Sequence, residues 1–127
     1  AIPALRESSH GRIVNTASVM AQGTDYGLAA YCASKAGVLG LTRTLALELG
    51  KFAITANAVL PGAIRTGMTR RGFDQPHIAE VWAKKAVLRR LGEPIDVARV
   101  ALFLASDDGA FVTGQAIAAD GGLTLRI

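Results

Sequence analysis

Three residues have the types and the spacing that proton transfer requires: Ser18, Tyr31 and Lys35. Tyr31 and Lys35 stand four residues apart in a segment expected to be helical, and residues four apart lie on one face of a helix. The Lys35 ammonium is therefore expected near the Tyr31 phenol, where a positive charge favours the phenolate. Such a phenol can give or take a proton near neutral pH. Ser18 follows the apolar, β-like run at 13–17, so its hydroxyl is expected at a strand end, within reach of a substrate oxygen.

The order Ser, then Tyr-x-x-x-Lys, resembles the signature of the short-chain dehydrogenase/reductase family. The flanking Gly-Arg-Ile-Val-Asn at 11–15 also fits that family. Further segments match in register and extend the resemblance over nearly all of the chain: Asn-Ala-Val-Leu-Pro-Gly at 57–62, Leu-Gly-Glu-Pro at 91–94, Val-Thr-Gly-Gln at 112–115 and Ala-Asp-Gly-Gly at 119–122.

The resemblance implies an α/β fold, namely the C-terminal half of a Rossmann-type doubly wound parallel sheet. A dinucleotide-binding fold is built from two βαβαβ halves. The family's N-terminal half carries a Gly-rich loop and a catalytic Asn, and no Gly-x-x-x-Gly-x-Gly run follows a strand in this sequence. We therefore interpret residues 1–127 as the C-terminal part of a single NAD(P)-binding domain, with the Gly-rich half absent.

The implied activity is the transfer of a hydride between a nicotinamide cofactor and a secondary alcohol or ketone, and 3-oxoacyl reductases are the nearest branch. By resemblance, Tyr31 is the general acid or base, Lys35 promotes its ionisation and binds the nicotinamide ribose, and Ser18 orients the substrate oxygen. The cofactor is NAD or NADP, because the segment that distinguishes them lies in the N-terminal half.

Four more residues match cofactor-contact positions of the family: Pro61, Gly62, Ile64 and Thr66. Glycine lets a backbone approach a ligand closely, although a Pro-Gly pair can also simply turn the chain. Three lid residues are candidates for lining the substrate pocket, with packing or surface roles as the alternative: Met68, His77 and Trp82.

Two other classes of function compete with the enzyme. One is a non-catalytic fragment or oligomerisation module that keeps the signature and lacks cofactor binding. The other is a nucleic-acid-binding module, because residues 65–90 hold seven basic residues against two acidic ones. Aromatic residues do not interleave this basic cluster, which disfavours nucleic acid. The cluster is interpreted either as a solvated segment or as a surface near an anionic substrate or cofactor phosphate.

The resemblance implies a small alcohol or carbonyl substrate, and the composition favours a cytoplasmic protein without membrane or nucleic-acid partners. Half of the residues are hydrophobic, and the single cysteine, Cys32, excludes an internal disulfide and suits a reducing compartment. Cys32 is interpreted as a small packing residue. Together with His10 and His77 it shows no metal-ligand spacing, and no apolar run is long enough to span a membrane.

Alternating strands and helices predict parallel βαβ units: strands at 12–17 and 52–59, a last strand within 111–119, helices at 28–50 and 94–105, and a short helix at 77–86 within a lid at 63–90. The long helix, ended by Gly50, carries two apolar stripes. Tyr31, Val38, Leu41, Leu45 and Leu49 are expected to face the sheet. The opposite stripe is interpreted as the interface of a homodimer or homotetramer, with an exposed alanine-rich face as the alternative: Ala29, Ala33, Ala36, Gly40 and Leu47.

Overall fold

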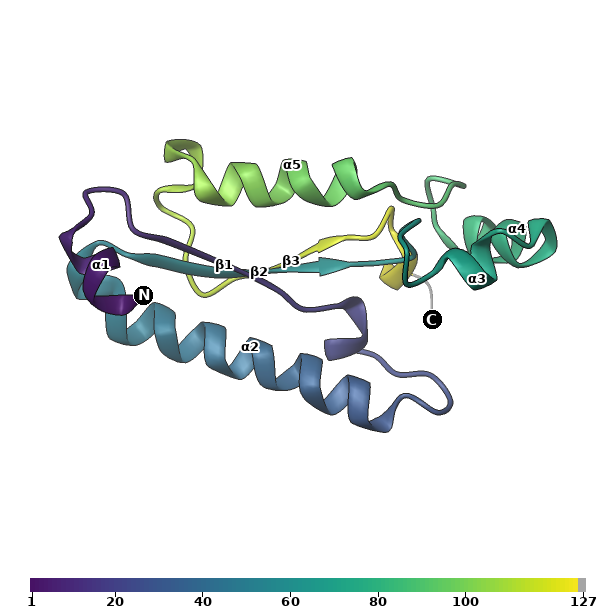
Figure 1. Ribbon diagram of the computed structural model, residues 1–127, viewed down its shortest axis with the longest axis horizontal. Coiled ribbons are helices and arrows are strands. Elements are labelled where there is room, and N and C mark those ends of the chain that lie inside the picture. Colours follow the sequence, from purple (N-terminus) through teal and green to yellow (C-terminus); the bar gives the residue numbers. More distant parts are fainter. Residues whose placement is uncertain (126–127) are drawn as a thin grey trace.

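A computed structural model describes residues 1–125 of the chain, and it is an α/β structure with one parallel sheet (Figure 1). No helix in this range is long and apolar enough to cross a membrane. The elements are α1 (Ile2–Glu7), β1 (Arg12–Thr16), η1 (Val19–Ala21), α2 (Ala29–Leu49), η2 (Gly50–Phe52), β2 (Thr55–Pro61), α3 (Arg70–Phe73), α4 (Pro76–Lys85), α5 (Pro94–Ala105), η3 (Asp107–Gly109), β3 (Ala116–Ala119) and η4 (Leu123–Leu125).

The strands lie in the order β1-β2-β3, and both pairings are parallel. Arg12 pairs with Thr55 at the start of the β1–β2 ladder, and Pro61 pairs with Ala119 at the end of the β2–β3 ladder. β2 is central and buried along nearly its whole length, as expected for a strand covered on both faces. β1 is only partly buried, because it lies at an edge of the described sheet.

Two helices enclose the sheet, α2 on one face and α5 on the other (Figure 1). α2 connects β1 to β2, and α5 connects β2 to β3, so both connections move the chain in the same direction across the sheet. Because the helices lie on opposite faces, the two crossovers have opposite hands, and one of them departs from the usual right-handed rule. The arrangement brings the carboxyl ends of all three strands to the side where α3 and α4 lie (Figure 1).

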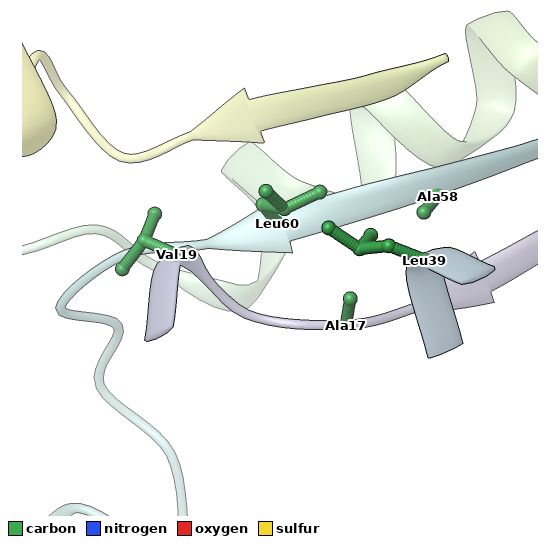
Figure 2. Packing of buried hydrophobic residues seen from close by; sticks show 5 residues of the cluster. All are labelled: Ala17, Val19, Leu39, Ala58 and Leu60. Atoms are coloured by element: carbon green, nitrogen blue, oxygen red, sulfur yellow. The ribbon is translucent and has the colours of Figure 1, made fainter. Parts of the chain in front are cut away.

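The core between the sheet and α2 is built from small and medium apolar side chains at the carboxyl end of the strands. Figure 2 shows Leu39 of α2 packed among strand and turn residues that are all buried: Ala17, Val19, Ala58 and Leu60. This packing fixes the first turns of α2 against the end of β1. The core therefore positions the segment that carries the predicted proton-transfer residues.

Two hydrogen-bonded asparagine side chains connect neighbouring elements. The Asn15 amide of β1 donates to the Thr42 hydroxyl of α2 at 2.9 Å, and Thr42 donates to the Val38 carbonyl at 2.7 Å. Asn57 is fully buried in β2; its amide donates to the Val112 carbonyl and its carbonyl accepts the Gln115 N–H. Buried amides are stable only with such partners. Asn15 thus joins β1 to α2.

The structure corrects the predicted buried face of the long helix. Leu49 is buried and Tyr31, Val38 and Leu45 are half-buried, but Leu41 is 55% exposed. The face against the sheet is instead completed by Leu39, Thr42 and Ala46. The prediction for Leu41 was wrong because it placed the buried face along the leucines of the helical wheel. Small side chains such as Ala46 and Thr42 can instead make the closest contacts with a sheet.

Several predicted boundaries also move. Gly50 follows α2 but stays right-handed, and the left-handed residue is Ala53, after one further turn. The central strand begins at Thr55 rather than residue 52, because η2 occupies the intervening residues. The last strand, β3 at Ala116–Ala119, lies within the predicted range 111–119. The preceding Val112–Gln115 segment bonds to β2 residues 56–58 through both backbone and side-chain groups. The lid holds α3 in addition to the predicted short helix.

Candidate active site

A cavity of about 360 Å³ opens at the carboxyl ends of β1 and β2. Three residues that the sequence singles out line it together: Ser18, Tyr31 and Gly62. They come from the turn after β1, the first turn of α2 and the turn after β2. The lid closes another wall with Met68 and Trp82, while His77 is not among the lining residues. The remaining lining is Val19, Met20, Ala63, Thr69, Gly72, Phe73, Ile78 and Leu123.

Ser18 is buried and held with its proton free. Its backbone is extended, and its Oγ accepts the N–H of Met20 at 3.1 Å, which caps η1. A serine hydroxyl has one proton to donate and two lone pairs to accept. The cap uses an acceptor position and fixes the oxygen, so the O–H is still available to donate to a substrate oxygen in the cavity.

Tyr31 and Lys35 share one face of α2, as the four-residue spacing predicts. The Lys35 Nζ lies 5.8 Å from the centroid of the Tyr31 ring. The same Nζ donates to the carbonyl of Thr16, the last residue of β1, at 3.2 Å. An ammonium has three N–H donors, so this anchor fixes the cation beside the phenol and leaves donors for a ligand.

Gly62 is required by the sheet itself. Its N–H donates to the Ala119 carbonyl at 3.1 Å, which joins the exits of β2 and β3. A Cβ built at this position would lie 2.7 Å from the Cα of Asp120, closer than real Cβ atoms approach a backbone. The close approach of two backbones therefore explains this glycine, whether or not a ligand also meets it.

The exit of β3 is fixed by the Asp120 carboxylate. Partial burial works to raise the pKa of this group, but hydrogen bonds outweigh it and hold the pKa below its usual value. The donors are the Thr124 hydroxyl at 2.8 Å and the backbone N–H groups of Gly122 and Thr124, each at 2.9 Å. Asp120 is thus a structural carboxylate that stays ionised near neutral pH.

Beyond Gly62, the chain forms a bridge opposite Gly92 at Ile64, whose side chain is buried. Gly92 donates to the Ala63 carbonyl at 2.9 Å and accepts the Arg65 N–H at 2.8 Å, in a parallel bridge opposite Ile64. In this parallel pattern the Ala63 carbonyl and the Arg65 N–H form the hydrogen bonds to Gly92. The N–H and the carbonyl of Ile64 itself point away from Gly92. Its carbonyl accepts the Thr69 hydroxyl at 2.7 Å. Its N–H has no protein partner within residues 1–125.

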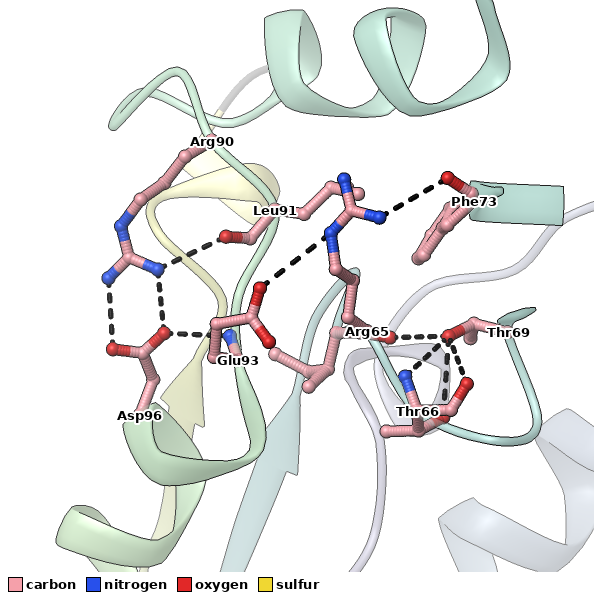
Figure 3. Close-up of polar contacts among 9 residues, drawn as sticks. Arg65, Thr66, Thr69, Phe73, Arg90, Leu91, Glu93 and Asp96 are labelled. Atoms are coloured by element: carbon pink, nitrogen blue, oxygen red, sulfur yellow. Dashed lines mark hydrogen bonds and ion pairs between the residues drawn. The ribbon is translucent and has the colours of Figure 1, made fainter. Parts of the chain in front are cut away.

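Thr69 connects this segment to the lid and was missed by the sequence reasoning. Besides donating to Ile64, its Oγ1 accepts the Thr66 N–H at 2.9 Å and lies 3.3 Å from the Thr66 hydroxyl (Figure 3). One side chain therefore fixes both predicted cofactor-contact positions. A threonine that follows a Pro-Gly turn within one helical turn of another threonine is a usable signal, because Ser and Thr hydroxyls commonly bond nearby backbone groups in turns.

Ion pairs hold the base of the lid to the start of α5 (Figure 3). Arg90 makes a bidentate pair with Asp96, at 2.6 and 2.9 Å, and Asp96 also accepts the N–H of Glu93 at 2.8 Å. These bonds lower the pKa of Asp96 and raise that of Arg90. Arg65 lies 3.6 Å from Glu93 and donates to the Phe73 carbonyl.

The basic lid segment is therefore largely neutralised. Arg65, Arg70, Lys84 and Arg90 each face a carboxylate, at distances from 2.6 to 3.9 Å. Lys85 instead lies over the Trp82 ring. Most of the basic side chains of the lid thus fit the interpretation as a solvated segment rather than as a surface for an anionic ligand.

The donors at this site suit a dinucleotide's nicotinamide end. The free Ile64 N–H, the Thr66 hydroxyl, the Lys35 ammonium and the Tyr31 phenol could hold its carboxamide and ribose, and all come from segments at the same sheet edge. No group of His, Cys, Asp and Glu side chains within residues 1–125 could hold a metal ion. Cys32 is half-buried, with its Sγ 3.6 Å from the Thr24 hydroxyl, in agreement with a packing residue.

Known proteins resemble the chain over its whole length. A family model described as enoyl-(acyl carrier protein) reductase matches residues 1–124. A meso-2,3-butanediol dehydrogenase from Serratia marcescens is 44% identical over 124 residues, which are 98% of this chain and 48% of that protein. A 3-oxoacyl-[acyl-carrier-protein] reductase from Thermotoga maritima is also 44% identical, over 98% of this chain and 50% of that protein.

Solved structures share the fold closely. The aldohexose dehydrogenase of Thermoplasma acidophilum has a TM-score of 0.94 and 34% identity, covering 100% of this chain and 53% of that one. A gluconate 5-dehydrogenase from Burkholderia cenocepacia, in complex with NADP and tartrate, has a TM-score of 0.92 and 30% identity, covering 99% of this chain and 49% of that one. The chain spans about half the length of these relatives. The fold, the matched segments and these relatives together show that the chain belongs to the short-chain dehydrogenase/reductase family.

Proposed function

We propose that the protein which carries this chain interconverts a secondary alcohol and a ketone with NAD or NADP. The observation that supports this most directly is that Ser18 and Tyr31 line one cavity beside Gly62, with Lys35 fixed on the Tyr31 side of α2. Relatives named as dehydrogenases and reductases, one of them solved with NADP, support the same class of reaction.

Each residue has a role that follows from its contacts. Ser18 donates its free O–H to the substrate oxygen and orients it. In reduction, Tyr31 gives its proton to that oxygen as negative charge develops; in oxidation it takes the proton back. Lys35, fixed by the Thr16 carbonyl, stabilises the phenolate that reduction leaves. A bound nicotinamide cofactor supplies or accepts the hydride.

The nicotinamide end is proposed to lie along the segment from Pro61 to Thr66. The Ile64 N–H and the Thr66 hydroxyl would bind the carboxamide, and Lys35 and Tyr31 the ribose. The adenosine half of the cofactor needs a Gly-rich loop at a helix N-terminus, so we assign residues 1–127 to the C-terminal part of one NAD(P)-binding domain. We further propose a cytoplasmic homo-oligomer that joins through the exposed stripe of α2.

Replacing Tyr31 tests the reaction. Tyr31→Phe keeps the ring and removes the proton, so turnover of a ketone such as ethyl acetoacetate with NADPH or NADH should fall about 10²- to 10⁴-fold. Tyr26→Phe is the matched control, because Tyr26 is fully exposed and lies outside the cavity lining. The oxidation of the cofactor is followed by absorbance in the native protein. If Tyr31→Phe turns over as fast as Tyr26→Phe, the assignment of Tyr31 is wrong.

A further inference from the structure

A second cavity, of about 540 Å³, adjoins the proposed active site. It lies between the lid and the loop that follows η1, and four residues line both cavities: Val19, Met20, Trp82 and Leu123. These shared side chains border both spaces, and the largest of them is Trp82. A substrate whose reacting carbon lies at Ser18 and Tyr31 can therefore extend past Trp82 into the second cavity.

The two cavities differ in chemistry. The first is lined by apolar side chains and by hydroxyls, and no charged residue within residues 1–125 contributes to it. The second is lined by charged and polar side chains on its outer side: Gln22, Thr24, Asp25 and Lys85. The apolar part of a substrate therefore belongs near the reacting carbon, and a polar or charged group belongs beyond Trp82.

Within residues 1–125, Lys85 is the cation among the residues that line this outer cavity. Its Nζ lies 4.3 Å from the centroid of the Trp82 ring, and it faces no carboxylate within residues 1–125. Its neighbour Lys84, by contrast, is paired with Glu80. The opposite charge in the cavity, Asp25, accepts the N–H of Tyr26 at 2.8 Å and so already has a hydrogen-bond donor. An ammonium stacked on an indole keeps N–H donors free for an anion.

We propose that the substrate carries, beyond a short apolar stretch from its carbonyl or alcohol carbon, an anionic group that Lys85 binds. This inference rests on the proposed function and adds a substrate class to it: a keto or hydroxy acid rather than a neutral alcohol. Trp82 sets the length of the apolar stretch, because the substrate must pass its ring to reach Lys85. Lys85 is thus a specificity-determining residue.

Binding can be measured without turnover, because Trp82 is the one tryptophan of this sequence and lies between the cavities. Its fluorescence is titrated in the native protein, with NADP present, using levulinate, 5-oxohexanoate and 6-oxoheptanoate and the ethyl ester of each acid. Trp82→Phe identifies the signal of this residue. We expect at least one acid to bind about two- to fivefold more tightly than its ester, in the range of an exposed charge contact. The preference should shrink as salt is added.

Lys85→Met should abolish that preference, whereas Lys84→Met, on the same helix, should retain it. Equal binding of acid and ester at every length, no binding by any of the six compounds, or equal loss in both variants would overturn the inference. Turnover is measured separately with the same compounds. Acids that bind through Lys85 but are never reduced would contradict the proposed function while leaving the anion subsite in place.

Discussion

A single hydroxyl, that of Thr69, fixes the backbone which we propose to meet the nicotinamide. It donates to the Ile64 carbonyl and accepts the Thr66 N–H. Both groups lie in the segment that leads from the sheet into the lid. Thr69 therefore acts through Ile64 and Thr66, as a positioning residue that keeps the free Ile64 N–H and the Thr66 hydroxyl in place.

Thr69→Val should weaken cofactor binding about tenfold. The variant keeps the shape of the side chain and removes both hydrogen bonds, each of which contributes a net ~0.5–1.5 kcal/mol. Calorimetric titration with NADP measures the affinity, and Thr69→Ser should restore it because the hydroxyl returns. If Thr69→Val acted only by lowering the stability of the fold, the hydroxyl of Thr69→Ser would not selectively restore the cofactor affinity. Equal affinities of Thr69→Val and the unsubstituted protein would exclude the positioning role.

The sequence was sufficient to predict the residues whose side chains carry chemistry. It was not sufficient to explain why some of the other site residues are needed. The spacing of Tyr31 and Lys35 already places them on one helix face. Gly62 could be identified as a turn residue, yet its close approach to Asp120 depends on a strand far along the chain. Thr69 was missed because the signal, two threonines within one helical turn after a Pro-Gly turn, does not show which backbone groups they bond.

At the scale of elements, α5 is tied to the lid by the carboxylate of Asp96. Its pKa is lowered by the hydrogen bonds from Arg90 and the Glu93 N–H. A lowered folded-state pKa means that the group stabilises the fold above its unfolded pKa of about 4, and that this contribution is lost as the pH falls through the folded-state value.

Asp96→Asn should therefore destabilise the protein at pH 7 and have a smaller effect in acid. The amide can still accept the Glu93 N–H, so the change removes mainly the charge. Denaturation by urea measures how far the variant lowers the free energy of unfolding at pH 7 and near pH 3. Asp74→Asn is the control, since its pair with Arg70 is longer, at 3.9 Å, and exposed. A destabilisation by Asp96→Asn that is the same at both pH values would contradict the charge-based explanation.

The exposed stripe of α2 is the surface we expect to join subunits. All of its residues are exposed in the single chain, Leu47 at 84%, and a Cβ built at Gly40 meets nothing within 4 Å. Gly40→Leu should therefore leave the fold of one chain intact and still disrupt an interface, where added bulk costs about 1–3 kcal/mol. Sedimentation of the native protein measures assembly. Gly37→Leu, equally open but outside the stripe, is the control; an unchanged oligomer in Gly40→Leu would exclude this interface.

Element types followed from the sequence more reliably than element faces. Pro94 at the first turn and Ala105 at the end mark α5 correctly. The buried face of α2 differs from the predicted one, because Leu41 points away from the sheet while Ala46 and Thr42 pack on it. Periodicity identifies a helix from its own residues, whereas the buried face also depends on the shape of the sheet beneath it.

For the whole molecule, the free edge of β1 is the feature with the largest consequence for handling the chain. Within residues 1–125, β1 pairs only with β2, and its other edge has unpaired backbone groups beside apolar side chains. Such edges promote aggregation. We expect residues 1–127, expressed alone, to aggregate and to show no NAD- or NADP-dependent turnover. Light scattering and a cofactor assay measure both properties, and a soluble, cooperatively unfolding and active chain would contradict this expectation.

The lid leaves and rejoins the sheet at one place, the bridge between Ile64 and Gly92. Residues 65–91 therefore form an excursion whose two ends are already held together, so its length changes the closure entropy only slightly. Insertions, deletions and exchanges within residues 70–91 leave the proton-transfer residues untouched, because these belong to α2 and to the turn after β1, and they also spare Thr66 and Thr69. In evolutionary terms the lid beyond Thr69 is a replaceable cassette: a lineage can acquire a new substrate by exchanging residues 70–91 while it inherits the chemistry unchanged.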